Sequence, residues 1–488
     1  MTFEAIIPKF KKRLSYWKQF TLSKIGKARV VEMFLASKLV YATKFYPLPS
    51  KMQKDLQDSI FKYTNFPNNV ITIGQKETWK IKLNGGCKLV NIQVKSATSK
   101  AKWLMEMATN CNFGVNLDTF TTLLGTQKGN NSGKDLIFLD KHYISRILKT
   151  DNPFYKEAFN TLALFDRMKG IAKPEDWDNE NIFYNPLVLS RSRKTIKETK
   201  YFRERNIFKL GQLLEEKSKQ ANGLPYDRAS VKLLGNIILN LGSMDTGAIK
   251  DDMVYLGNTQ HVKMTQITQK DLYEDAILRT STDHGHQAKW VNKLDTVILW
   301  DEVWGSVHNF LLSNKTKTSI WEQLHLNFYT QYSYNKWHDQ TDNCPLCGEV
   351  PLDIYHIILD CDFVTTLWAQ IQPTLFKLYG NLVNDEEKAL GIVQIKSTPG
   401  IMPRNWIGYK IREEILLLER RAYHSPKAAN IDLFKSRFNN SLATEVKQLM
   451  FRFHSEGNSS KFEEIVAYKG VLCEKVGEEE YRLNSVFS

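Results

Sequence analysis

The chain has 488 residues, of which 42% are hydrophobic and 12% aromatic, which suggests about three domains and excludes the low-hydrophobicity signature of a disordered protein. The formal net charge is +14. Residues 1–100 carry 19 of the 67 basic and 5 of the 53 acidic residues, so the other 388 hold 48 of each and the whole surplus lies in the first fifth.

Such a basic segment favours a polyanionic partner, either nucleic acid or an anionic membrane surface. A solvated helical face is the alternative. The sequence has no run of about 18 apolar residues and no signal-peptide pattern at its start. We therefore expect a soluble intracellular protein, nuclear or cytoplasmic, with no membrane partner.

Helices are predicted over most of the first hundred residues. Between Phe10 and Tyr46 apolar residues recur at helical spacing, with Lys and Arg between them. Pro47 and Pro49 end this stretch, and a further helix is expected from Ser50 to about Thr64. In residues 70–95 apolar and polar residues alternate weakly, with Gly85-Gly86 interrupting the pattern, which suits short strands or an extended loop. The side chains expected to face the core include Val31, Phe34, Leu35 and Leu39.

Further along, Gln127 to Lys134 is rich in Gly and Asn and is the clearest candidate linker. Residues 184–205 are a second possible boundary. Helical patterns follow at Ile207 to Lys217, after Trp300 and at Ile411 to Arg421. The sequence thus predicts a mainly α, multi-domain protein, with a basic helical domain at 1–126, a connecting helical region at 135–290, and a C-terminal helical domain at 291–488 that contains a small zinc-knuckle insert at 344–361.

One motif carries chemistry. Cys344, Cys347, His356 and Cys361 have the spacing C-x2-C-x8-H-x4-C, and Gly348 eases the turn after the first pair. Three thiolates and an imidazole complete the tetrahedral shell of a structural zinc ion, with no open position for a reacting water. The alternatives are a chance cluster of reduced thiols and an iron–sulfur cluster, which the histidine disfavours. The remaining cysteines are expected to be ordinary thiols: Cys87, Cys111 and Cys473.

Three weaker motifs have simpler interpretations. Asp283-His284-Gly285-His286 could hold a metal ion but reads as a solvated loop. The segment from Gly129 to Asp135 faintly resembles a phosphate-binding loop, yet Asp135 replaces the Ser or Thr that would bind magnesium. Asp251-Asp252 is a carboxylate pair in a polar segment, and a solvated turn or helix start explains it.

The cysteine motif, with Cys-Pro-Leu-Cys-Gly at its head and His-Ile-Ile-Leu-Asp-Cys at its tail, resembles the zinc knuckle near the C-terminus of LINE-type non-LTR retrotransposon reverse transcriptases. Its longer spacing before the histidine separates it from the retroviral nucleocapsid knuckle. Other segments resemble, in the same order, the thumb, the connecting region and the helices after the knuckle of those enzymes: Trp17 with Leu22 to Arg29, Lys38 to Tyr41, Pro47 to Pro49, Asn179 to Ile182, Glu204 to Leu214, and Leu390-Gly391 with Lys410 to Arg421.

The departures from that family bear on activity. A reverse transcriptase holds two magnesium ions with aspartates, usually in an aromatic-x-Asp-Asp turn, and no such turn precedes the thumb-like segment. No endonuclease-like region precedes it either. Asp353 stands where the family often carries Thr or Ser, which should remove a small hydrogen bond but spare the ligands. The resemblance therefore implies the non-catalytic, substrate-holding part of an RNA-directed DNA polymerase.

The leading hypothesis is nucleic-acid binding, to RNA first and also to DNA, with zinc as the cofactor. Tyr16 and Trp17 could stack on bases, although a Trp at helical spacing usually belongs to a core. The alternatives are a protein-interaction or scaffold role through an apolar thumb-like face, with a purely structural zinc site, and an active polymerase. The first four of the residues expected on phosphates also suit a nuclear address, and the full set is Lys9, Lys11, Lys12, Arg13, Lys18, Lys24, Lys27 and Arg29.

Overall fold

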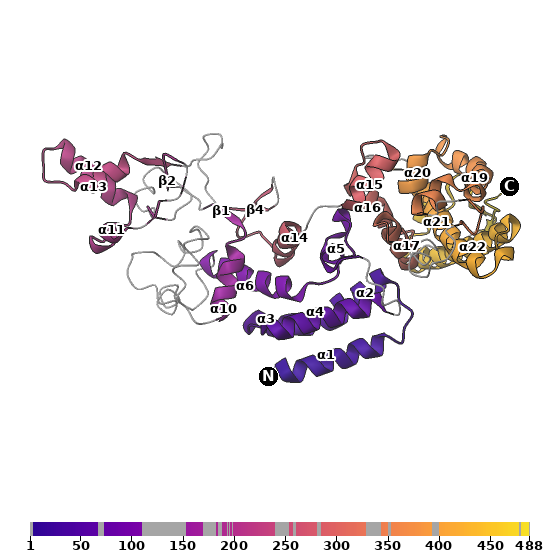
Figure 1. Cartoon of the computed structure of the whole chain (residues 1–488), viewed down its shortest axis with the longest axis horizontal. Coiled ribbons are helices and arrows are strands. Elements are labelled where there is room, and N and C mark those ends of the chain that lie inside the picture. The colour runs from indigo at the N-terminus through magenta and orange to yellow at the C-terminus, as the bar shows by residue number, and fades with distance from the viewer. Residues whose placement is uncertain are drawn as a thin grey trace. The chain divides into compact units, whose positions relative to one another are not determined.

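The computed structural model is mainly helical, with a few short strands (Figure 1). The fold class predicted from the sequence is confirmed at this level. The chain forms two compact units: a first unit of residues 1–12, 33–59 and 90–280, and a second unit of residues 13–32, 60–89 and 281–488. The structure describes residues 3–66, 73–109, 153–168, 182–183, 188–192, 194, 196–197, 199–239, 253–256, 260–280, 285–327, 343–349, 353–392, 400–477 and 480–487.

The helices predicted near the N-terminus are confirmed. Ser23 begins one of them by accepting a hydrogen bond from the backbone N–H of Gly26 at 3.1 Å. Of the two alternatives for 70–95, short strands are wrong for the described residues. Two short helical turns are followed at 86–91 by a stretch without regular structure, as the extended-loop alternative predicts, and then by a long helix. The elements of this stretch are α1 (Phe3–Trp17), α2 (Lys24–Val30), η1 (Val31–Ala36), α3 (Ser37–Phe45), α4 (Ser50–Asn65), α5 (Gln75–Trp79), η2 (Lys82–Asn84) and α6 (Ile92–Thr109).

The inward face predicted around Phe34 needs a correction. Val31 and Leu39 are fully buried, as expected, but 50% of Phe34 is exposed. The cause is η1, a six-residue π-helix that widens the turn here. A π-turn uses more residues than the 3.6 of an α-helix, so a side chain inside it, such as Phe34, leaves the stripe that α-helical spacing predicts.

The core of the first unit is built around α6, which packs against α3, α10 (Pro153–Leu162) and α14 (Gln269–Thr280). Leu104, Phe159 and Leu272 lie in this core with at most 2% of their surface exposed. A three-stranded antiparallel sheet has the order β1-β4-β5. Its strands are β1 (Asp166–Met168), β4 (Met253–Leu256) and β5 (Gln260–Lys263).

A second, smaller cluster in this unit forms around Leu213, which is fully buried, with Ile182 and Phe202. Two antiparallel strands accompany it, with Leu189 opposite Ile238. The elements are β2 (Val188–Ser190), α11 (Lys200–Glu204), α12 (Leu210–Ala221), α13 (Arg228–Leu234) and β3 (Ile237–Leu239). The helix predicted at 207–217 is thus confirmed, with bounds a few residues later.

The second unit is organised on α21 (Ile401–His424), the helix predicted from the pattern at 411–421. Most of its length is buried, and α17, α19, α22 and η4 pack against it. Besides α2, α5 and η2 from the N-terminal stretch, the unit contains α15 (Gly285–Leu294), α16 (Trp300–Val307), α17 (Asn314–Leu324), η4 (His356–Asp360), α19 (Asp362–Tyr379), α20 (Asp385–Leu390), η5 (Pro426–Ala428), α22 (Ile431–Ser455), α23 (Ser459–Ile465), η6 (Tyr468–Gly470), β6 (Cys473–Lys475) and β7 (Tyr481–Leu483).

Two buried charged side chains of α21, Arg404 and Lys410, are held by ion pairs. Arg404 donates to both carboxylate oxygens of Glu387 at 2.6 Å. Lys410, 3% exposed, lies 3.0 Å from Glu445 and 3.2 Å from Glu413. Buried charges of this kind persist only when they are paired, so α21 depends on these contacts as well as on apolar packing.

Several sequence predictions fall outside the described residues: the linker at 127–134, the pair Asp251-Asp252, Cys111, and the Asp283-His284 half of the histidine motif. Within the described part of the chain, no helix has both the length and the apolar character needed to span a bilayer.

Candidate metal centre

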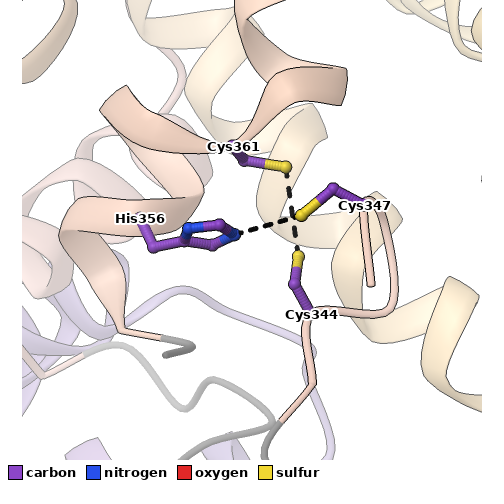
Figure 2. Close-up of side chains that lie close together, drawn as sticks. All are labelled: Cys344, Cys347, His356 and Cys361. Atoms are coloured by element: carbon purple, nitrogen blue, oxygen red, sulfur yellow. Dashed lines mark hydrogen bonds between the residues drawn. The ribbon is translucent and has the colours of Figure 1, made fainter. Parts of the chain in front are cut away.

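The four predicted ligands come together in the second unit (Figure 2). Their ligand atoms all lie within 4.8 Å of one another. The Sγ atoms of Cys344 and Cys361 are 3.9 Å apart, and Sγ of Cys347 is 3.4 Å from Nε2 of His356. Around a tetrahedral zinc ion, two sulfurs would lie about 3.8 Å apart and a sulfur and a nitrogen about 3.6 Å. The arrangement can therefore hold a metal ion.

A tight loop presents the first two cysteines. The carbonyl of Cys344 accepts from the backbone N–H of Gly348 at 2.8 Å, and the N–H of Cys344 donates to the carbonyl of Glu349 at 2.9 Å. Gly348 has a φ of +81°, in the left-handed region that glycine adopts without a side-chain clash. This turn folds the loop back so that both thiols face the same point.

A helix presents the other two ligands. His356 opens η4, and Cys361 is the N-cap of α19, so the site sits on elements that belong to the core. Ile357 and Ile358 of η4 are at most 1% exposed, and η4 packs against α19, α20 and α21. The sequence predicts a small insert at 344–361, but the second half of this insert is continuous with the helical core.

Asp353 makes a hydrogen bond at this position, although its presence in place of Thr or Ser was expected to remove one. Its Oδ1 accepts from the backbone N–H of His356 at 2.7 Å. The expectation is wrong because an aspartate oxygen caps a helix N-terminus as well as a hydroxyl does. The contact fixes the backbone at the histidine ligand.

The thiols of Cys344 and Cys361 share a hydrogen bond. Donation from Cys361 favours the thiolate of Cys344 and lowers its pKa to about 5, while the same bond and burial raise the pKa of Cys361. Without a cation, Cys344 thus ionises readily, whereas Cys361 keeps its proton and donates it to the Cys344 thiolate. A cation between them would stabilise both thiolates, which is the form that binds metal ions.

The other cysteines that the structure describes stand apart from this group. Cys87 and Cys473 are buried and free, and burial raises the pKa of Cys87 to about 12 and that of Cys473 to about 11. Both are inert thiols, as expected. His286, from the weaker histidine motif, packs its ring 4.2 Å from that of His325 and 6.5 Å from Trp304.

The basic residues predicted on α1 lie on its exposed side. Ile7, Phe10 and Leu14 are buried on the opposite side. Lys11 forms an ion pair with Asp55 at 2.7 Å. The other predicted cations from this stretch are exposed and make no ion pair within the described residues: Lys9, Lys12, Arg13 and Lys18.

The three cations predicted on α2 differ in their surroundings. Lys24 pairs with Glu322 at 2.7 Å. Lys27 is 4% exposed, donates to the carbonyl of Phe66, and burial lowers its pKa. Arg29 is exposed. Of the three, only Arg29 has its charge free for an external anion.

Aromatic side chains accompany these cations in each unit. Tyr16, 55% exposed, contacts Trp17 and Phe20 edge to face. In the first unit a cavity of about 730 Å³, which no motif or spacing predicts, joins residues far apart in the chain. Its lining is Lys44, Tyr46, Pro47, Trp103, Pro153, Phe154 and Tyr155.

Comparison with known proteins does not identify the chain. No protein-family model matches it, and no curated protein matches it. The metal-ligand geometry therefore rests on the structure alone.

Proposed function

We propose that this chain is a non-catalytic nucleic-acid-binding protein, corresponding to the C-terminal part of a LINE-type reverse transcriptase and holding a structural zinc ion. RNA is the ligand proposed first, and DNA is a further one. The proposal draws on the sequence resemblance, the charge distribution and the four-ligand group.

The exposed side of α1 carries this proposal. Lys9, Lys12 and Arg13 follow one another along the helix, and none is neutralised by a carboxylate of the described chain. A row of unpaired cations attracts a phosphate backbone by releasing its counterions, and this contribution dominates non-specific binding. The buried opposite side means that these charges are not needed for packing.

Aromatic groups support a single-stranded ligand. Tyr16 lies on the same helix as the cations and exposes its ring, and Trp103 and Phe154 line the cavity of the first unit beside Lys44. Unpaired bases stack on such rings, and each stacked base contributes about 1–3 kcal/mol.

Zinc is the proposed metal because three thiolates and one imidazole in a closed group are its usual structural ligands. Bound there, the ion would supply four bonds that join the loop at 343–349 to η4. The four ligands leave no position for a water nucleophile, so the role is to stabilise the fold.

The test is the binding of fluorescent single-stranded RNA to the full chain between about 50 and about 200 mM salt. Affinity should fall steeply with salt. Charge reversal at Lys9, Lys12 and Arg13, each changed to Glu, should weaken binding and reduce the slope of log K against log salt by about 2, because each lost phosphate contact removes about 0.7.

A matched variant carries the same change of charge at three exposed positions of the C-terminal region, Lys427, Arg437 and Lys447. It should keep the wild-type slope. Absence of RNA binding by the wild-type chain at the lowest salt, or equal losses in both variants, would contradict the proposal. Primer extension with magnesium and a labelled template tests the non-catalytic part, which any nucleotide incorporation would overturn.

A second candidate is protein binding through η1 and α3. Met33, Tyr41 and Tyr46 are 64%, 71% and 62% exposed, and Phe34 lies among them. Large apolar side chains gathered on one short segment mark interaction sites. If this surface binds a second copy, sedimentation equilibrium should show self-association that Met33→Ser with Tyr41→Ser abolishes while RNA binding remains.

A further inference from the structure

A second group of cations lies in the second unit, and of its members only Arg29 is among the residues predicted to bind nucleic acid. It consists of Arg29 on α2, Lys82 on η2 and Lys317 on α17, with His308 at the end of α16. Within the described residues none of these side chains forms an ion pair or hydrogen bond. Nothing in the local sequence links them, because they come from four separate elements.

Specific contacts fix the elements that carry the group. The carbonyl of Gly85, directly after η2, accepts from Nε1 of Trp321 at 2.7 Å and lies 2.7 Å from Nε2 of His325. Gly85 has a φ of +78°, and a Cβ there would lie 2.8 Å from the ring of Trp304. The η2 turn is therefore held against α16 and α17 at a point where no larger residue fits.

The α2 helix is held against α17 in the same way. The N–H of Ile25 donates to Oγ1 of Thr318 at 3.3 Å, and Lys24 pairs with Glu322 at 2.7 Å. Thr318 directly follows Lys317, and Arg29 lies one helical turn beyond Ile25. Three elements that are far apart in the sequence, α2, η2 and α17, are thus packed together, and each carries one of the three cations.

The positive charges in this group repel one another. Lys317 is only 7% exposed, and burial together with the positive charges of Arg29 and Lys82 lowers its pKa to about 8. Burial and the same cations lower the pKa of His308 to about 3. The carboxylate of Glu32 acts on Lys82 in the opposite direction, but it is exposed, makes no ion pair with Lys82 within the described residues and only partly offsets the lowering of the pKa of Lys82.

His308 adds a second, independent sign of a missing partner. Both ring nitrogens are buried without a hydrogen bond. Buried polar groups in folded proteins nearly always have partners, and a buried lysine without a counter-ion is rarer still. A bound oxyanion would be a partner for His308 and for Lys317, because the neutral imidazole donates one N–H to it and the lysine supplies a positive charge.

We propose that Arg29, Lys82, Lys317 and His308 form a binding site for a phosphate group. The planar guanidinium group of Arg29 can donate hydrogen bonds to two phosphate oxygens at once, whereas the ammonium groups of the two lysines act as point charges. The phosphate group can be free or part of a nucleic-acid backbone. The inference that the site binds the phosphates of a nucleic acid rests on the function proposed above, whereas the inference that it binds a free phosphate ion does not.

The test compares the full-length protein in inorganic phosphate and in chloride at equal ionic strength and fixed pH. Phosphate should raise the melting temperature, since a ligand bound only by the folded state stabilises it. Lys317→Met removes an unpaired buried charge and should not unfold the chain. Together with Lys82→Met it should weaken phosphate binding by about tenfold or more, the loss expected for charge-assisted hydrogen bonds.

Lys289→Met is the matched control, because Lys289 is an exposed cation on α15 of the same unit with no partner in the described residues. It should bind phosphate as the wild type does. No shift by phosphate in the wild type, or equal affinity in the Lys82→Met, Lys317→Met double variant, would overturn the site.

The same variants with single-stranded RNA separate this proposal from the earlier one. Loss of RNA affinity in the double variant but not in Lys289→Met would show that the site binds the phosphate backbone of RNA. Phosphate binding without any RNA binding by the wild type supports the site and refutes the nucleic-acid function. RNA binding without phosphate-dependent stabilisation refutes the site and leaves that function standing.

Discussion

Replacement of Cys361 by Ala is the most direct test of the metal centre. Its Sγ is fully buried and lies 3.9 Å from that of Cys344, so the change removes one ligand from inside the structure. Zinc binding to four-ligand peptides contributes about 10–16 kcal/mol. A quarter of that is about 3 kcal/mol per ligand, which predicts roughly a 150-fold loss of zinc affinity.

Cys473→Ala is the matched control, because Cys473 is an equally buried free thiol of the same unit, far from the four ligands in sequence and not part of their group. Both variants lose the packing of one sulfur, but only Cys361→Ala should lose zinc. Zinc content and competition with a chromophoric chelator measure the affinity, and melting with and without chelator measures the coupling to stability. Unchanged zinc affinity in Cys361→Ala, or an equal loss in Cys473→Ala, would refute the assignment of ligands.

Three further predictions concern the stability of the second unit. The pKa of His308 is about 3 in the folded protein, against a usual value of 6.5, so below pH 6.5 the unfolded chain binds a proton that the folded chain does not. The free energy of unfolding should therefore fall as the pH drops below 6.5, by up to about 2 kcal/mol at pH 5. His308→Gln should remove this part of the pH dependence, which chemical denaturation measures. Lys410→Met removes the cation shared by Glu413, Glu414 and Glu445, of which only Glu413 keeps another ion pair within the described residues, with Lys315 at 3.3 Å, and it should cost about 3–5 kcal/mol in the same assay. Gly400→Ala should lower the melting temperature far more than Gly457→Ala, because both have positive φ but only at Gly400 would a Cβ meet a backbone oxygen, that of Leu378, at 2.1 Å.

What the sequence predicted well depends on neighbours close in the chain. The helices of the N-terminal stretch and α21 follow from spacing, and the four ligands follow from a motif of eighteen residues that reads as one group. What it could not predict depends on distant contacts. Lys27 is buried because the carbonyl of Phe66 accepts from it, and Phe34 is exposed because a π-helix changes the turn.

The cations at Lys82 and Lys317 show the same limit more sharply. Each looks like an ordinary surface lysine in its own segment, and neither is among the residues predicted to bind nucleic acid, although Lys82 lies within the basic first hundred residues. Only the packing of η2 and α17 through Gly85 brings them together. Charge counted along the sequence therefore locates a basic region but not a binding site, since a site is made by charges that converge in space.

The metal centre and the cation clusters should contribute differently to RNA binding. Three thiolates around a divalent zinc ion leave a net charge of about −1 on the first shell, which repels phosphate. Loss of zinc in Cys361→Ala should therefore lower the fraction of folded protein without changing the slope of log K against log salt, whereas loss of Lys9, Lys12 and Arg13 should change the slope. If the slope falls in Cys361→Ala as well, the knuckle region itself must neutralise phosphates, and a purely structural role for the metal is wrong.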